Sequence, residues 1–272
     1  MKPRTLILRA AGTNCDQETA HAFALAGAEP HRVHVNRFLR DECRLDDYQI
    51  LAIPGGFSHG DDIAAGKILA NQLEHHLRDA LREFVESGRP IIGICNGFQV
   101  LVKTELLPGP LAGATGQTCT LTNNVSGRFV DRWIKLLPRQ SRCIWTKDLA
   151  AAAGTSGQIE LPVAHGEGRF IPANEAVRKA LWDNQQVALV YADAAGQPAA
   201  GAFPDNPNGS VDDIAGVCDA TGLIFGLMPH PERYVEATQH PAWRSRPGQI
   251  GQGLAIFQNA VSYVQEAVGA GA

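Results

Sequence analysis

The amino-acid sequence predicts an α/β fold in which a mostly parallel central sheet is flanked by helices. Short apolar runs alternate with longer amphipathic stretches through the first third of the chain, and glycine or proline separates them. This alternation is typical of parallel strands connected by helices. Of the 272 residues, 44% are hydrophobic and 19% are charged, which is typical of a globular chain with a substantial core. We expect a single domain over residues 1–272, with its last few residues frayed.

Strands and helices are expected to alternate as far as Pro108. The expected strands are residues 5–10, 32–35, 49–53 and 91–94. The expected helices are residues 16–26, 63–85 and 97–106. Gly27 is a candidate C-cap of the first helix, and Asp61 or Asp62 can cap the start of the second.

The pattern changes beyond Pro108, where we expect a β-rich excursion around residues 115–195 inserted into the α/β core. Its predicted strands are residues 119–122, 128–136, 142–145, 165–171 and 187–192, with a loop at 154–157. The earlier pattern returns with a strand at residues 224–228 and a C-terminal helix at about 253–268.

Charge and cysteine content exclude several classes of protein. The net charge of −4 gives no support for nucleic acid or an anionic membrane surface as a partner. No apolar segment approaches the roughly 20 residues needed to span a bilayer, and the N-terminal apolar run is too short for a signal peptide. The six cysteines show no C-x-x-C spacing and are too sparse for a disulfide scaffold. These features favour a cytoplasmic protein with reduced thiols and no metal site.

The most informative segment is residues 90–99, Pro-Ile-Ile-Gly-Ile-Cys-Asn-Gly-Phe-Gln. A buried strand here would deliver Cys95 into a tight turn before a helix, which is the thiol version of a nucleophile elbow. Gly93 and Gly97 would avoid crowding in that turn, and a helix starting at Asn96 would favour the thiolate. The alternative is a small buried cysteine in a parallel sheet. The other five cysteines lack this context and are expected to be structural: Cys15, Cys43, Cys119, Cys143 and Cys218.

A catalytic thiol needs a base and a group that orients the base. Residues 229–232 read Pro-His-Pro-Glu, and the two prolines favour extended geometry at His230. In an extended segment residues i and i+2 share a side, so Glu232 would hold the imidazole of His230. The alternative is a loop histidine with a solvated glutamate beside it.

Acyl transfer also needs donors for the developing oxyanion. The N–H of Asn96 is one candidate, and the loop Pro-Gly-Gly-Phe-Ser-His-Gly at residues 54–60 offers a second through Gly56 or Phe57. No segment matches the phosphate loop G-x-x-x-x-G-K-[ST], so ATP binding on this chain is unsupported.

Together these segments resemble the class I (triad) glutamine amidotransferases. Within that superfamily the chain resembles the glutaminase subunits of phosphoribosylformylglycinamidine synthases, which act in purine biosynthesis. The resemblance covers nearly the whole chain, and Asn-Gly-Phe-Gln after the cysteine and Asn-Pro-Asn-Gly-Ser at 206–210 are typical of this branch. His59 stands where many relatives have tyrosine. The matching segments are residues 12–16, 54–58, 60–62, 93–99, 165–168, 206–210 and 226–233.

The resemblance implies a flavodoxin-like fold and a role for each matching residue. Cys95 would form a γ-glutamyl thioester with the side-chain amide of glutamine, His230 would act as base and then as acid, and Glu232 would orient it. Gly56 and Asn96 would supply oxyanion N–H groups. Gln99 and Phe57 would contact glutamine. His165, Asn208 and Ser210 would line the site or meet a partner, or would simply form turns.

The resemblance also implies that the released ammonia goes to a synthetase subunit, with a small third subunit in the same complex. ATP and Mg²⁺ would bind that partner, and this chain would bind no cofactor. Two alternatives are a class I glutaminase serving another synthetase, such as those for GMP or anthranilate, and a non-enzymatic regulatory subunit on the same fold. A third is a cysteine-elbow protein of the protease-like or chaperone-like relatives, which typically lack Pro-His-Pro-Glu.

Overall fold

Nine strands form the central sheet of the computed structural model, which describes residues 2–111, 116–152, 157–246 and 250–270. These strands are β1 (Arg4–Arg9), β2 (Glu29–His34), β3 (Ile50–Ile53), β4 (Ile91–Ile94), β6 (Val130–Pro138), β7 (Ile159–His165), β9 (Val187–Ala192), β10 (Ile214–Cys218) and β11 (Ile224–Leu227). Their order across the sheet is β2-β1-β3-β4-β11-β10-β9-β6-β7.

The sheet has a parallel half and an antiparallel half. Strands β2, β1, β3, β4 and β11 are parallel, as the sequence predicts, and β1, β3, β4 and β11 are buried along most of their length because helices cover both faces. Strands β10, β9, β6 and β7 continue from β11 in antiparallel pairs. The predicted β-rich excursion therefore extends the central sheet. Strands β5 (Cys119–Thr122) and β8 (Arg169–Pro172) pair separately.

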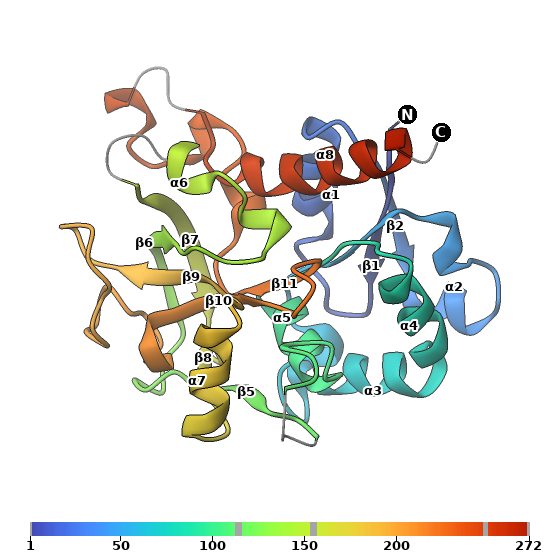
Figure 1. The fold of residues 1–272 in the computed structure, drawn as a ribbon, viewed down its shortest axis with the longest axis horizontal. Helices are drawn as coiled ribbons and strands as arrows, with labels where there is room; N and C mark the ends of the chain where they lie inside the picture. The colour runs from blue at the N-terminus through green and yellow to red at the C-terminus, as the bar shows by residue number, and fades with distance from the viewer. Residues whose placement is uncertain (1, 112–115, 153–156, 247–249, 271–272) are drawn as a thin grey trace.

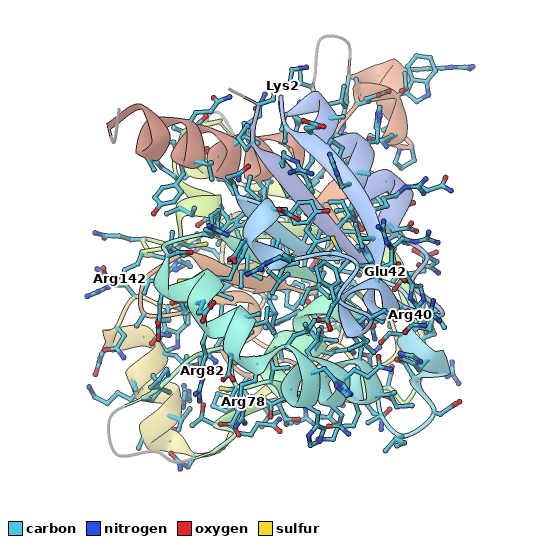
Figure 2. All side chains as sticks on the ribbon, turned by 90° about the vertical axis from the view of Figure 1, so that its right-hand side faces the viewer. Lys2, Arg40, Glu42, Arg78, Arg82 and Arg142 are labelled. Carbon is cyan, nitrogen blue, oxygen red and sulfur yellow. The ribbon has the colours of Figure 1, made fainter. Side chains whose placement is uncertain are left out.

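Helices pack on both sides of the parallel half (Figure 1). Helices α1 (Asp16–Leu25) and α8 (Leu254–Ala270) lie together on one side, and α3 (Lys67–His76), α4 (Arg78–Glu86) and α5 (Asn96–Lys103) lie on the other. The other α-helices of the described residues are the short α2 (Val35–Leu39) and α6 (Leu149–Ala152) and the longer α7 (Glu175–Asp183). Figure 2 shows charged side chains on the outside, among them Arg40, Glu42, Arg78 and Arg82. In the described residues, no helix combines the length and apolar character that a membrane crossing requires.

The predicted helix at residues 63–85 is wrong in two respects. It begins at Lys67, after Gly66 with φ of +73°, where an added Cβ would lie 2.9 Å from Val100 Cγ2. It also breaks at Leu77 into α3 and α4. Leu73, Leu77 and Leu81 are all buried, and neither glycine nor proline stands at the break.

Two predicted strands beyond Pro108 are also wrong. Residues 142–145 turn into a short 3₁₀ helix that buries Trp145, whose Nε1 donates to the carbonyl of Leu223 at 2.8 Å. Residues 165–171 are divided between the end of β7 and β8. A Cβ at Gly168 would lie 2.4 Å from the ring of His165, so the chain turns tightly there.

The C-terminal helix is longer than predicted and includes Gly269 and Ala270, which were expected to fray. Residues 271–272 and most of the predicted loop at 154–157 lie outside the described residues.

Candidate active site

Three neighbouring parallel strands, β3, β4 and β11, bring the predicted site residues to one end of the sheet. The chain leaves β3 into Gly55 and Gly56, leaves β4 into Cys95, and leaves β11 into the segment that carries His230. Carboxyl ends of parallel strands lie at the same end of a sheet, so these three segments meet. The N–H of Cys95 donates to the carbonyl of Leu227 at 2.8 Å, which fixes the start of the elbow against β11.

Cys95 has the strained backbone that a nucleophile elbow requires. Its φ is +52° and its ψ is −104°, and it immediately precedes α5. The flanking glycines are needed for space. A Cβ at Gly97 would lie 1.8 Å from the carbonyl oxygen of Ile53, and one at Gly93 would lie 2.6 Å from the carbonyl oxygen of Gly97. The turn therefore holds the thiol at the N-terminus of α5.

His230 and Glu232 form a buried pair, with His230 Nδ1 lying 2.6 Å from Glu232 Oε1. The two side chains are 2% and 0% exposed. The predicted extended segment through Glu232 is wrong, because Pro231–Arg233 form a 3₁₀ turn directly after His230, which has φ of −105° and ψ of 88°. The turn nevertheless folds the carboxylate onto the imidazole, and the contact leaves Nε2 as the ring nitrogen free for chemistry.

The surroundings of His230 favour its protonated form. Burial alone would lower the pKa of His230, but the Glu232 carboxylate and the Cys95 thiol outweigh it and raise that pKa well above its usual value. His230 Nε2 is buried and has no hydrogen-bond partner among the described residues. A Cβ at Gly55 would lie 2.9 Å from His230 Cε1 and 3.5 Å from the Cβ of Cys95. The absence of a side chain at Gly55 therefore leaves room for the side chains of His230 and Cys95.

The two predicted oxyanion donors lie on the segments that follow β3 and β4. Gly56 has φ of +138°, and a Cβ there would lie 2.7 Å from the N of Asn14, so glycine is required. Within the described part of the chain, the N–H groups of Gly56 and Asn96 donate to no other group. The N–H of Phe57 donates to the carbonyl of Gly12 at 3.0 Å, which leaves Gly56 as the donor on this loop.

The two predicted glutamine contacts are placed differently. Gln99 is buried, its Nε2 donates to the carbonyl of Glu167 at 2.6 Å, and its Oε1 accepts from Asn96 Nδ2 at 3.0 Å. Both the oxygen and the nitrogen of the Gln99 amide are thus hydrogen-bonded within the chain. The bond to Glu167 connects residues 165–168 to α5. Phe57 is 48% exposed, and its ring centroid lies 6.5 Å from that of Phe129.

His165, Asn208 and Ser210 form one buried polar cluster beside the site. His165 Nδ1 lies 3.2 Å from Asn124 Oδ1, and Asn208 Nδ2 donates to the carbonyl of Gly168 at 2.8 Å. Ser210 Oγ donates to Asn208 Oδ1 at 2.7 Å and accepts from the N–H of Phe170 at 2.9 Å. Because all three side chains are buried, they do not form a surface for a partner; they hold the turn at residues 166–168 that Gln99 contacts.

Cys15 is a site neighbour that the sequence reasoning assigned to structure alone. Its Sγ accepts from Arg233 Nη2 at 3.1 Å and donates to Asn14 Oδ1 at 3.1 Å. Burial raises the pKa of this thiol, so it stays protonated beside His230. The sequence did offer one indication that Cys15 lies near the site: it follows β1, and β1 is the neighbour of β3 in the sheet.

One group of described residues is close enough to hold a metal ion. It consists of Cys15, His230 and Glu232, whose ligand atoms lie within 4.8 Å of one another. Within this group the His230 imidazole and the Glu232 carboxylate are already hydrogen-bonded to each other.

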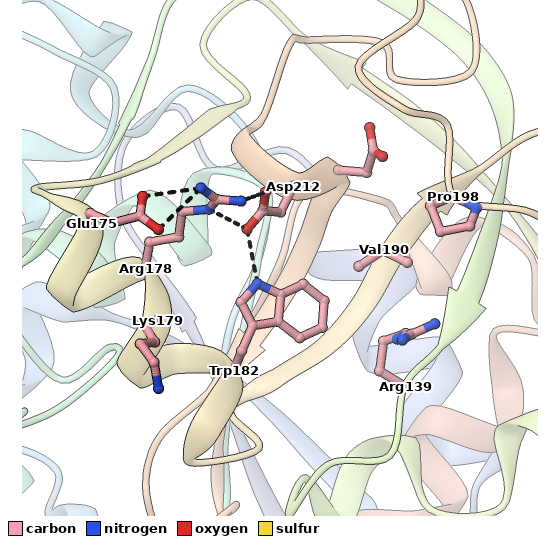
Figure 3. A pocket seen from close by; sticks show the side chains of 9 residues that line it. Arg139, Glu175, Arg178, Lys179, Trp182, Val190, Pro198 and Asp212 are labelled. Carbon is pink, nitrogen blue, oxygen red and sulfur yellow. Dashed lines mark hydrogen bonds and ion pairs between the residues drawn. The ribbon is translucent and has the colours of Figure 1, made fainter.

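A cavity of about 490 Å³ lies at α7 and contains none of these site residues (Figure 3). Its charges are largely paired: Arg178 contacts both oxygens of Asp212 at 2.7 Å and Glu175 at 3.0 Å, and Trp182 Nε1 donates to Asp212 at 2.9 Å. The ion pairs that line this cavity therefore hold α7 in place. The lining contains no cysteine, serine or histidine that could act as a nucleophile or base.

Comparison with known proteins connects this geometry to a family. The model of the CobB/CobQ-like glutamine amidotransferase domain matches residues 2–264. Phosphoribosylformylglycinamidine synthase subunit PurQ of Dehalococcoides mccartyi is 46% identical over 267 residues, which cover 97% of this chain and 99% of the relative. The PurQ subunit of Treponema denticola is 47% identical over 86% of this chain and 89% of the relative.

Solved structures agree. A chain in the structure of PurLQS from Thermotoga maritima superposes with a TM-score of 0.71 at 32% identity, covering 97% of this chain and 100% of that one. A glutamine amidotransferase from Thermotoga maritima has a TM-score of 0.54 at 12% identity over 98% of this chain and 99% of its own, and this likeness concerns the fold alone.

Proposed function

The chain belongs to the PurQ family of phosphoribosylformylglycinamidine synthase subunits, within the CobB/CobQ-like glutamine amidotransferases, and on that premise we propose that it releases ammonia from glutamine for a synthetase subunit. The observation that carries the proposal is the arrangement of Cys95 on a strained elbow beside the buried His230–Glu232 pair. A nucleophile, a base and an orienting carboxylate are the parts that acyl transfer needs.

The reaction follows from these positions. The Cys95 thiolate attacks the side-chain amide carbon of glutamine, and the N–H groups of Gly56 and Asn96 stabilise the oxyanion. His230, kept protonated by Glu232, donates a proton to the amide nitrogen, the carbon–nitrogen bond breaks, and ammonia leaves. Neutral His230 then takes a proton from water as the water oxygen attacks the γ-glutamyl thioester. The carbon–sulfur bond breaks, glutamate leaves, and the Cys95 thiolate and protonated His230 are restored.

The partner is the subunit that uses the ammonia. The relative from Thermotoga maritima is part of PurLQS, and we propose the same division here, in which a synthetase subunit, a small third subunit and this chain form one complex. ATP and Mg²⁺ would bind the synthetase subunit, while this chain would carry no cofactor. All six cysteines are free, which supports a reducing compartment such as the cytoplasm.

Substitution Cys95→Ala in the assembled complex tests the proposal. We expect glutamine-dependent synthesis of phosphoribosylformylglycinamidine to be lost, while synthesis from added ammonium continues at the wild-type rate. Cys43→Ala is the matched control, because this free thiol contacts Tyr48 OH at 3.5 Å and lies outside the site. Glutamine-dependent synthesis that survives Cys95→Ala would exclude Cys95 as the nucleophile, and loss of ammonium-dependent synthesis would contradict the division of labour.

A further inference from the structure

The side chain of Asn96 joins the loop after β3 to the start of α5, the two segments that carry the predicted oxyanion donors. Its Oδ1 accepts from the N–H of Ser58 at 3.3 Å, and Ser58 lies two residues after Gly56. Its Nδ2 donates to Asp61 Oδ1 at 3.1 Å and to Gln99 Oε1 at 3.0 Å. The main-chain N–H of Asn96 is itself one donor, so the side chain of one donor residue holds the loop that carries the other.

The orientation of this amide is determined by its neighbours. A main-chain N–H such as that of Ser58 can only donate, and the Asp61 carboxylate can only accept. Gln99 is fixed in the same way, because its Nε2 donates to the carbonyl of Glu167. The contacts therefore permit one arrangement, in which the Asn96 oxygen faces the loop and its nitrogen faces Asp61.

Asp61 also closes a strained turn. Three consecutive residues have left-handed backbone: His59 (φ +54°), Gly60 (φ +72°) and Asp61 (φ +53°). Such geometry is unfavourable for residues with a Cβ and persists only where the surroundings hold it. Asp61 Oδ1 accepts from the N–H of Gly66 at 3.1 Å as well as from Asn96, so one carboxyl oxygen ties the turn to both the start of α3 and the start of α5.

We propose that Asp61 and the side chain of Asn96 are positioning residues that set the distance between the N–H groups of Gly56 and Asn96. This inference rests on the proposed glutaminase function. Without the Asp61 carboxyl group the Asn96 amide can rotate and the turn can relax, so the Gly56 N–H shifts relative to that of Asn96. Misplacing one donor costs part of the stabilisation that an oxyanion hole gives, which is worth about 10²–10³ in rate per donor.

Asp61→Gly in the assembled complex is the direct test, because glycine tolerates the positive φ and removes only the side chain. We expect the rate of ammonia release from glutamine to fall about 10- to 100-fold. Alkylation of Cys95 by iodoacetamide forms no oxyanion, so its rate should stay within about twofold of wild type. Asp62→Ala, which removes the adjacent exposed carboxylate, is the matched control and should leave both rates unchanged.

Two further variants keep the proposal testable if Asp61→Gly does not fold. Asn96→Ala keeps the main-chain donor and should show the same loss with alkylation retained. Asp61→Asn retains an acceptor oxygen and tolerates the backbone, so it should restore the rate to within about fivefold of wild type. A glutamine rate within twofold of wild type in Asp61→Gly, or an equal loss of alkylation, would overturn the proposal. Failure of the proposed function itself is separate, since it would appear as glutamine-dependent synthesis that does not require Cys95.

Discussion

Two histidines close to Cys95 are buried to a similar extent but are held in opposite protonation states. His230 has the Glu232 carboxylate beside it, which raises its pKa against the effect of burial. His165 has amide neighbours instead of a carboxylate, and burial together with the charge of nearby His230 lowers the pKa of His165 to about 3. One imidazole is thus prepared to move a proton, while the other is a neutral hydrogen-bonding group.

This difference predicts how stability depends on pH. Unfolded histidine titrates near pH 6.5, so between about pH 6.5 and 3 the unfolded state binds a proton at His165 that the folded state does not. Stability should therefore fall as the pH falls through this window. The titration of His230 has the opposite effect on stability, and it does so at higher pH. Its stabilising contribution is complete below about pH 6.5 and is lost as the pH rises through its elevated pKa.

The measurement is the free energy of unfolding from urea denaturation at several values between pH 5 and 6.5. His165→Gln keeps an amide that can donate to Asn124 and removes the titration. We expect its slope to be smaller than that of wild type by up to about 1.4 kcal/mol per pH unit. Parallel slopes for the two proteins would show that His165 is already neutral in the unfolded chain or charged in the folded one, contrary to the prediction.

At the scale of elements, the site is built by the contact between β3 and the start of α5. Gly97 packs against the carbonyl of Ile53 so closely that a methyl group has no room. Gly97→Ala should therefore destabilise the fold by about 2–4 kcal/mol and lower glutaminase activity with it. Gly269→Ala is the control: no atom lies within 4 Å of its added Cβ, so it should leave stability unchanged or raise it by up to about 1 kcal/mol. Thermal denaturation of both variants tests this, and an equally stable Gly97→Ala would contradict the packing argument.

Four of the parallel strands, β1, β3, β4 and β11, could be predicted from sequence because each is a short apolar run near glycine or proline. Strand β2 reads Glu-Pro-His-Arg-Val-His, and Val33 is its one buried residue. The strands that were missed lack this pattern. Pro162 interrupts β7, which tolerates it as the last strand of the sheet, and Gly216 interrupts β10 where its register shifts. Helix α7 was not predicted, although the sequence contains features typical of a helix. Asn174 caps it by accepting from the N–H of Val177 at 2.9 Å, and Val177 and Leu181 form its buried side.

The site followed the same rule. Cys95, Gly56 and His230 could be placed together because each lies shortly after the carboxyl end of a parallel strand. The engagement of Gln99 by Glu167 and the approach of Cys15 to His230 depend on tertiary contacts between distant segments. No local pattern in the sequence encodes those contacts.

At the scale of the whole molecule, the antiparallel half of the sheet covers the thiol. Strand β7 brings the carbonyl of Ala164 to 3.8 Å from Cys95 Sγ, and the N–H of His230 donates to Pro162 of the same strand at 2.8 Å. Cys95 is only 6% exposed. We therefore expect glutamine to reach the thiol only when part of this surface moves. Phe57 is exposed beside Gly56, and we expect a bound subunit to contact this apolar side chain.

We therefore expect the chain by itself to be a weak glutaminase. Its rate of ammonia release should rise at least about tenfold when the synthetase subunit is bound, because binding energy would favour an open and aligned site. Ammonia release from glutamine, measured for the purified chain with and without the partner, tests this, and Cys95→Ala in the same complex corrects for ammonia from other sources. Full turnover by the chain alone would mean that the site opens without the partner. In that case the partner would serve to receive ammonia, with no part in preparing the thiol.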